Sequence, residues 1–78
     1  MNWTPLESSV LTAVAYSHDD HSLYLEFRSG AISCYFDFPL YQYDEFLAAE
    51  SKGRYFSADI RDRYRCQRVR RLTGGARG

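Results

Sequence analysis

Residues 22–39 of this 78-residue chain read SLYLEFRSGAISCYFDFP, and this stretch decides the fold. Apolar side chains stand at every second position of residues 23–27, the period that is typical of a strand with one buried face. The connection at residues 28–30 contains a glycine, which can take the positive φ that a tight hairpin turn demands. A second strand is expected over residues 32–36, and Pro39 ends it because proline has no N–H for a sheet ladder.

The second of these strands has two faces of different composition. We assign Ile32, Cys34 and Phe36 to its buried face, because they alternate along the strand and are apolar. Ser33 and Tyr35 then belong to the outer face.

A further strand is predicted upstream, over residues 10–16. β-branched and aromatic types are frequent there, and the turn-forming residues 17–21 follow. The three strands together predict an antiparallel β-meander.

After the strands, the apolar period changes to steps of three and four, which indicates a helix that covers the sheet. Its apolar stripe is predicted to consist of Leu40, Tyr43, Phe46 and Leu47. Gly53 is expected to end this helix in the left-handed cap conformation.

A second helix is predicted from Ser57, whose hydroxyl can cap the first free amides. Arg61, Arg65 and Arg68 stand three or four positions apart and would form one row along it. The fold class is therefore predicted as α+β, a three-stranded antiparallel β-meander followed by two helices packed on one sheet face (β-β-β-α-α).

The length of the chain allows a single domain, which we expect over residues 1–72, with a flexible tail over residues 73–78. Cys34 and Cys66 are interpreted as reduced thiols, because nothing else indicates a disulfide framework. The first residues lack the pattern of a signal peptide, and no apolar run reaches the roughly 18 residues of a membrane helix. We therefore expect a cytoplasmic protein without a membrane partner.

The formal net charge of zero conceals two opposed halves. Residues 1–50 hold eight acidic residues against one arginine, a charge of −7, whereas residues 51–78 hold nine cations against two acids, a charge of +7. One interpretation is a basic segment that meets an anion such as nucleic acid. The other is an internal dipole whose halves attract each other.

Three stretches carry a resemblance to a known family: SGAISCYFDFP at residues 29–39, AAESKGRYF at residues 48–56 and IRDRY at residues 60–64. Together they resemble the KTSC domain, and the resemblance covers roughly residues 8–69. The family is found alone in bacterial proteins or appended to lysyl-tRNA synthetases, which implies RNA binding as an expectation. Its central Tyr-x-Tyr is replaced here by Ser-Cys-Tyr, so only Tyr35 can inherit a role from that motif.

The sequence offers no catalytic constellation, so we predict no enzyme and no cofactor. Cys34 could pair with His18 or His21, but its place among strand residues favours core packing. The run from His18 to His21 contains four groups that could bind zinc. We favour a polar hairpin turn and predict no metal, because structural zinc sites draw ligands from two separated pairs.

RNA or another polyanion is the expected partner, because arginine holds phosphate in a bidentate manner and stacks on bases. Tyr24 and Tyr35 are predicted to point outward on the sheet, but Glu26 and Asp37 beside them would repel phosphate. The candidate nucleic-acid-binding residues are Lys52, Arg54, Arg65, Arg68, Arg70, Arg71 and Tyr35. Arg61 and Arg63 are assigned mainly to structure, as partners of nearby acids.

The alternative function is a protein interaction or self-associating module. It would use the outward aromatic side chains and a sheet edge, because tyrosine is enriched in interface cores. In that case the arginines would meet acidic residues of a partner protein or of a second copy.

Overall fold

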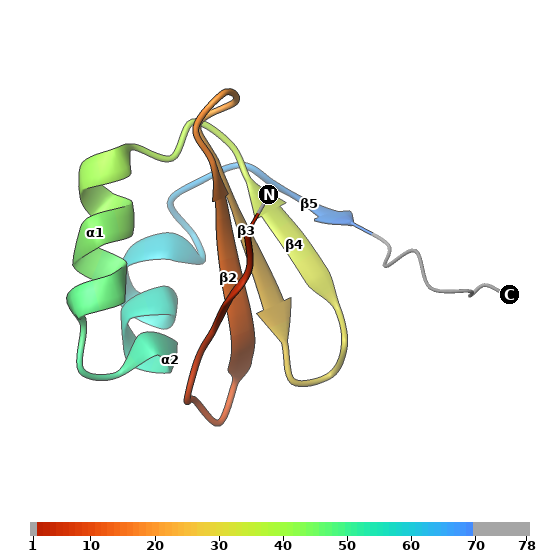
Figure 1. Ribbon diagram of the computed structural model, residues 1–78, viewed down its shortest axis with the longest axis vertical. Coiled ribbons are helices and arrows are strands. Elements are labelled where there is room, and N and C mark those ends of the chain that lie inside the picture. The colour runs from red at the N-terminus through yellow and green to blue at the C-terminus, as the bar shows by residue number, and fades with distance from the viewer. Residues whose placement is uncertain (1, 70–78) are drawn as a thin grey trace, which may run out of the picture.

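A five-stranded antiparallel sheet forms one layer of the structure, and the helices form a second layer on one face of it (Figure 1). This computed structural model describes residues 2–69, so the predicted tail at 73–78 lies outside the described residues. In chain order the elements are β1 (Thr4–Pro5), β2 (Leu11–Ser17), β3 (Ser22–Phe27), β4 (Ile32–Tyr35), α1 (Leu40–Ala48), α2 (Lys52–Tyr55), the π-helix η1 (Phe56–Ile60) and β5 (Cys66–Val69). The strands follow one another in sequence order, which makes β1 and β5 the two edges of the sheet.

The three predicted strands are confirmed as β2, β3 and β4, but the predicted three-stranded meander is too small. β5 lies where the arginine spacing favoured a helix. Arg61 follows η1 in a turn, Arg65 precedes β5 and Arg68 lies within it, so the predicted row of arginines does not exist. The outer edge of β4 offers unpaired backbone groups to this segment, and pairing with them outweighs a weak local helix preference.

The first helix is confirmed as α1, but it ends at Ala48 and not at Gly53. The Ser51 hydroxyl accepts a hydrogen bond from the Arg54 amide at 3.2 Å and so caps a new helix, α2. Gly53 lies inside α2, and Ser57 lies inside η1. The predicted caps at Gly53 and Ser57 are therefore wrong, because an N-cap serine six residues before Ser57 restarts the helix.

The buried face of α1 differs in part from the predicted apolar stripe. Phe46 is fully buried and Tyr43 is half-buried, as expected, but Leu40 and Leu47 are 45% and 38% exposed. Gln42 is buried in their place.

The Gln42 side chain connects α1 to the chain that leads into β5. Its Nε2 atom donates to the Asp59 carbonyl oxygen at 3.2 Å, and its Oε1 atom accepts a hydrogen bond from the Tyr64 hydroxyl. Both polar ends of the amide are thus hydrogen-bonded, which offsets the free-energy cost of removing this side chain from water.

The register of the sheet corrects the predicted faces of β4. Leu23 stands opposite Tyr35, and Tyr24 stands opposite Cys34. Directly opposed residues share a face, so Tyr35 lies with Leu23 on the helix face and Cys34 lies with Tyr24 on the outer face. The predicted burial of Ile32 and Cys34 is confirmed, since they are 8% and 4% exposed, but the predicted outward position of Tyr35 is wrong. β4 has large or apolar side chains on both faces, so its alternation does not decide which face packs against the helices.

The core lies between the helix face and the helices. Its buried members are Leu11, Val14, Tyr16, Leu23, Leu25, Tyr35, Phe38, Phe46, Phe56 and Ile60. Gly30 adopts φ 98°, which confirms the expected hairpin turn, and both cysteines are free thiols. No helix among residues 2–69 is long and apolar enough to cross a membrane.

Candidate polyanion-binding surface

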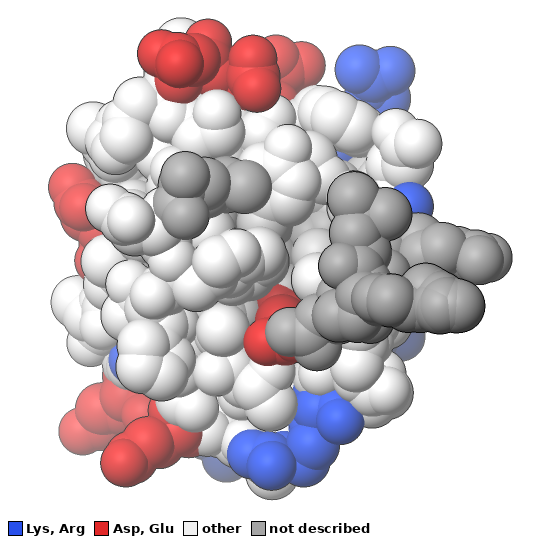
Figure 2. Space-filling model, turned by 45° about the vertical axis from the view of Figure 1, so that its right-hand side comes forward, with Lys and Arg blue, Asp and Glu red and all other residues white. Residues whose placement is uncertain are grey.

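Charged side chains of like sign gather in groups on the surface. Figure 2 shows acidic side chains at the top, the left and the lower left of one side of the molecule, and basic side chains at its upper right, right and bottom. One acidic side chain lies near the middle of this view. Charges of one sign therefore gather in patches, which is the arrangement that attracts a multivalent counterion.

Three exposed arginines accompany β5, and we call Arg61, Arg65 and Arg68 the basic margin. The Arg65 guanidinium lies 5.5 Å from the centre of the Phe36 ring, a cation–π contact that leaves its N–H groups free to bind an anion. Arg68 stands opposite Ser33, on the helix face of β4.

Arg61 and Arg63 were predicted to pair with nearby acids. No ion pair or side-chain hydrogen bond joins either arginine to another residue within 2–69, so this interpretation is wrong there. Arg61 instead lies near the Tyr35 hydroxyl, where its charge partly opposes the effect of burial, which raises the pKa of that hydroxyl. Arg61 therefore belongs with the cations that remain available to a ligand.

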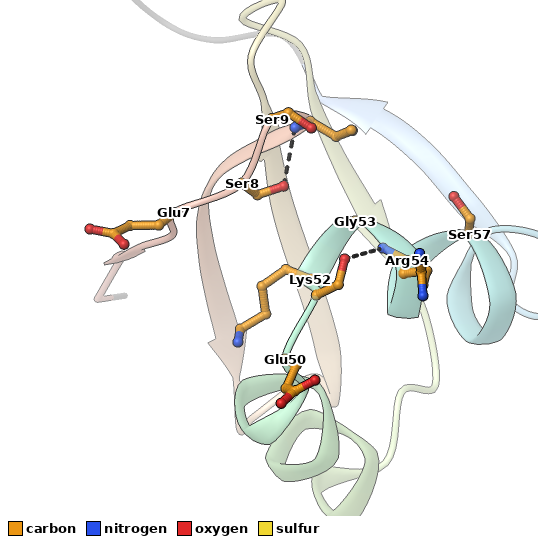
Figure 3. Close-up of a pocket in the computed structure, with 10 residues that line it drawn as sticks. Glu7, Ser8, Ser9, Glu50, Lys52, Gly53, Arg54 and Ser57 are labelled. Atoms are coloured by element: carbon orange, nitrogen blue, oxygen red, sulfur yellow. Dashed lines mark hydrogen bonds between the residues drawn. The ribbon is translucent and has the colours of Figure 1, made fainter.

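Lys52 and Arg54 line a second candidate region, an open groove of about 500 Å³ between the β1–β2 connection and the start of α2 (Figure 3). The groove is lined by Glu7, Ser8, Ser9, Val10, Glu50, Ser51, Lys52, Gly53, Arg54 and Ser57. Lys52 donates to the Ala49 carbonyl oxygen at the end of α1, so its ammonium group stabilises the fold. The Arg54 side chain is exposed and makes no such bond to another residue of the described part of the chain, but Glu7 and Glu50 nearby make the groove less basic than the margin.

The structure changes the aromatic part of the predicted site. Tyr35 is only 4% exposed, and its ring lies 6.0 Å from that of Phe56 in the core. It is therefore not available to stack on a base, and its nomination as a binding residue is corrected. Arg70 and Arg71 lie outside the described residues.

Tyr24 takes the position on the outer face that the sequence assigned to both tyrosines. It is half-buried, and a hydrogen bond with Cys34 is the main cause that raises its pKa. The partner of the Cys34 thiol is thus a phenol and not a histidine.

The histidine loop has the features of a polar turn. The His18 ring packs edge-on against Tyr16 with centroids 5.0 Å apart, and the Ser17 hydroxyl donates to Asp20. Within residues 2–69 no group of three or more His, Cys, Asp or Glu side chains could hold a metal ion.

An α+β domain with one helix-covered sheet face and a basic edge is the class that these features define. The family model of the KTSC domain matches residues 7–64, and the chain belongs to the KTSC domain family. A protein of Tsukamurella paurometabola is 38% identical over 61 residues, which cover 78% of this chain and 91% of that protein. The crystal structure of a KTSC domain protein from Yersinia pestis is similar, with a TM-score of 0.86 and 28% identity, covering 88% of this chain and 97% of that one.

Proposed function

We propose that this KTSC domain is a non-catalytic binding module of the bacterial cytoplasm that holds RNA or a related polyanion on its basic margin. The observation that carries the proposal is the set of exposed arginines around β5 that form no ion pair with other described residues. Two free thiols are compatible with a reducing compartment.

The identity of the cations supports a phosphate ligand. Arginine presents a planar fork of donors that matches phosphate oxygens, and it keeps its charge at any physiological pH. Arg65 is already held in place over Phe36, so less side-chain freedom is lost when it binds.

The site does not include a platform of stacked tyrosines, because Tyr35 is buried in the core. Contacts to the backbone of the nucleic acid would then dominate, and such contacts position a ligand without reading its sequence. We accordingly expect binding that depends strongly on salt and weakly on RNA sequence.

The test is fluorescence anisotropy with labelled tRNA and with unstructured RNA over a range of salt concentrations. Four contacts, from Arg54 and the three arginines of the basic margin, would give a log-log salt slope of about −3 for a single strand. Absence of binding at low salt and micromolar protein would overturn the proposal.

A pair of single substitutions controls for net charge. Arg68→Gln removes a cation of the basic margin and should reduce the salt slope by about 0.7. Arg28→Gln removes the same charge at another site, where the guanidinium donates to the Ser8 carbonyl oxygen at 2.6 Å. Equal losses for the two variants would show a non-specific charge effect and contradict a site at the margin.

A further inference from the structure

The hydrogen-bond pattern of the sheet determines which backbone groups of β5 face away from it. The Phe36 amide donates to the Arg65 carbonyl at 3.0 Å, so these two residues form a hydrogen-bonded pair. Bonded and non-bonded pairs alternate along an antiparallel ladder. Gln67 opposite Cys34 is therefore bonded to β4, whereas Cys66 and Arg68 are not.

The N–H and C=O groups of Cys66 and Arg68 consequently point outward along the free edge. Both residues are exposed, and no other described residue donates to or accepts from these four backbone groups. The strand contains no proline and no bulge, two of the common means by which proteins blunt an edge.

The opposite edge, β1, is blocked. The Leu6 amide donates to the Thr12 carbonyl at 3.0 Å, and by the same alternation Thr4 is bonded to Val14 while Pro5 is not. The backbone nitrogen of Pro5 thus occupies the outward position, where it has no hydrogen to donate. Only β5 of the two edges offers a donor and an acceptor at each outward residue.

We propose that two copies of this chain pair through β5, antiparallel and about a two-fold axis at Gln67. In this register Cys66 of one copy opposes Arg68 of the other, and the reverse, so all four outward groups of each strand are used. The two Gln67 side chains meet at the axis. The two sheets become one continuous sheet of ten strands.

The register is selected by the geometry of the edge. Opposed residues of an antiparallel pair lie on the same face of the sheet, and neighbouring residues of one strand lie on opposite faces. A two-fold axis can therefore pass at Gln67 or at a neighbouring residue, but it cannot pass midway between two adjacent residues. An axis at Arg68 would place two guanidiniums opposite each other, which is unfavourable. An axis at Cys66 would pair Arg68 with Tyr64, which lies outside the strand.

Charge makes this dimer depend on salt in a direction opposite to RNA binding. The axis brings two copies of the basic margin together, and their mutual repulsion weakens the dimer at low ionic strength. Added salt should therefore strengthen pairing. Docking of the acidic half of one copy on the basic half of another would weaken with salt instead.

The first experiment measures mass by light scattering or sedimentation in a concentration series without RNA, at low and high salt. Wild type should show a concentration-dependent dimer that is more populated at high salt. Arg68→Pro removes one outward N–H and should be monomeric, while the charge-matched control Arg68→Gln should still dimerise. A wild-type protein that is monomeric at every concentration, or an Arg68→Pro variant that dimerises like Arg68→Gln, would overturn the proposal.

A second experiment tests the register and does not depend on how well the proline variant folds. Cysteine introduced at the axis, as Cys66→Ser with Gln67→Cys, should form a covalent dimer under mild oxidation, because a non-hydrogen-bonded pair has Cβ atoms about 4.5–5.5 Å apart. Wild type, in which Cys66 opposes Arg68, should cross-link at least tenfold more slowly. Faster cross-linking through Cys66 would exclude this register, and neither result depends on RNA binding.

Discussion

The two edge strands of the sheet, β1 and β5, differ in how far their backbone groups can pair with another strand. β1 is only two residues long and places a proline at its outward position, so it cannot extend the sheet. β5 is four residues long, and the N–H and C=O groups of two of its residues point outward beside three arginines. Within residues 2–69, one edge is therefore closed by backbone chemistry, while the other is protected by charged side chains, whose charge salt or a polyanion can neutralise.

The largest expected effect concerns the aromatic rings beneath the two edges. Tyr35 is 4% exposed and stands opposite Cys66 of β5, whereas Tyr43 near Thr4 of β1 is half-buried and stacks on Tyr16 at 4.9 Å. We expect Tyr35→Ala to lower the free energy of unfolding by about 3–5 kcal/mol and Tyr43→Ala by clearly less. Chemical denaturation of both variants gives the comparison, and equal losses would contradict the placement of Tyr35 in the core.

The next effect separates the inward from the outward residues of β5. Gln67→Pro removes an N–H that is bonded to β4 and should cost about 1–3 kcal/mol of stability. Arg68→Pro removes an N–H that points outward and should cost much less. Thermal unfolding of the two variants at low protein concentration measures the difference. A larger loss of stability for Arg68→Pro would show that the N–H of Arg68, and not that of Gln67, is bonded to β4.

Alkaline pH affects the rings under both edges. Burial raises the pKa of Tyr35 and of Tyr43 above the ordinary 10.0, so in the folded protein both hydroxyls keep their protons longer than in the unfolded chain. Their contribution to stability is complete below pH 10.0 and is lost as pH rises through the higher folded values. Urea midpoints should be constant below this pH and fall above it, and Tyr35→Phe should make the fall shallower. A urea midpoint that increases as the pH is raised above 10.0 would contradict this direction of the pH dependence.

The smallest effect should follow from opening the closed edge. Pro5→Thr restores an outward N–H on β1 and should change stability by less than about 0.5 kcal/mol, because the site is exposed. The informative measurement is mass at high protein concentration. A two-residue strand offers few hydrogen bonds, so we expect little additional association, and strong oligomerisation would show that Pro5 alone keeps this edge closed.

Much of the fold could be predicted from local patterns. The alternation at residues 23–27, the glycine at the hairpin and the change of period after Pro39 identified three strands and the first helix correctly. The edge strands could not be found this way. β1 is too short to show a period, and β5 forms because β4 has an open edge, which is a property of the assembled sheet.

The candidate site was predicted less well, for a reason that lies in β4. Either set of alternate residues in this strand can be buried, so the sequence does not decide whether Cys34 or Tyr35 faces the helices. The presence of many arginines in the C-terminal segment follows from composition alone. Their arrangement does not, because spacings of three and four in a polar segment fit a helix, a turn or an exposed strand equally well.

The side-chain amide of Gln42 joins two parts of the molecule through one donor and one acceptor hydrogen bond. Its donor faces the Asp59 carbonyl and its acceptor faces the Tyr64 hydroxyl, so a carboxylate at this position would set two acceptors against each other. Through this one side chain, α1 is linked to the segment that enters β5. We expect a ligand that displaces this segment to change amide exchange in α1.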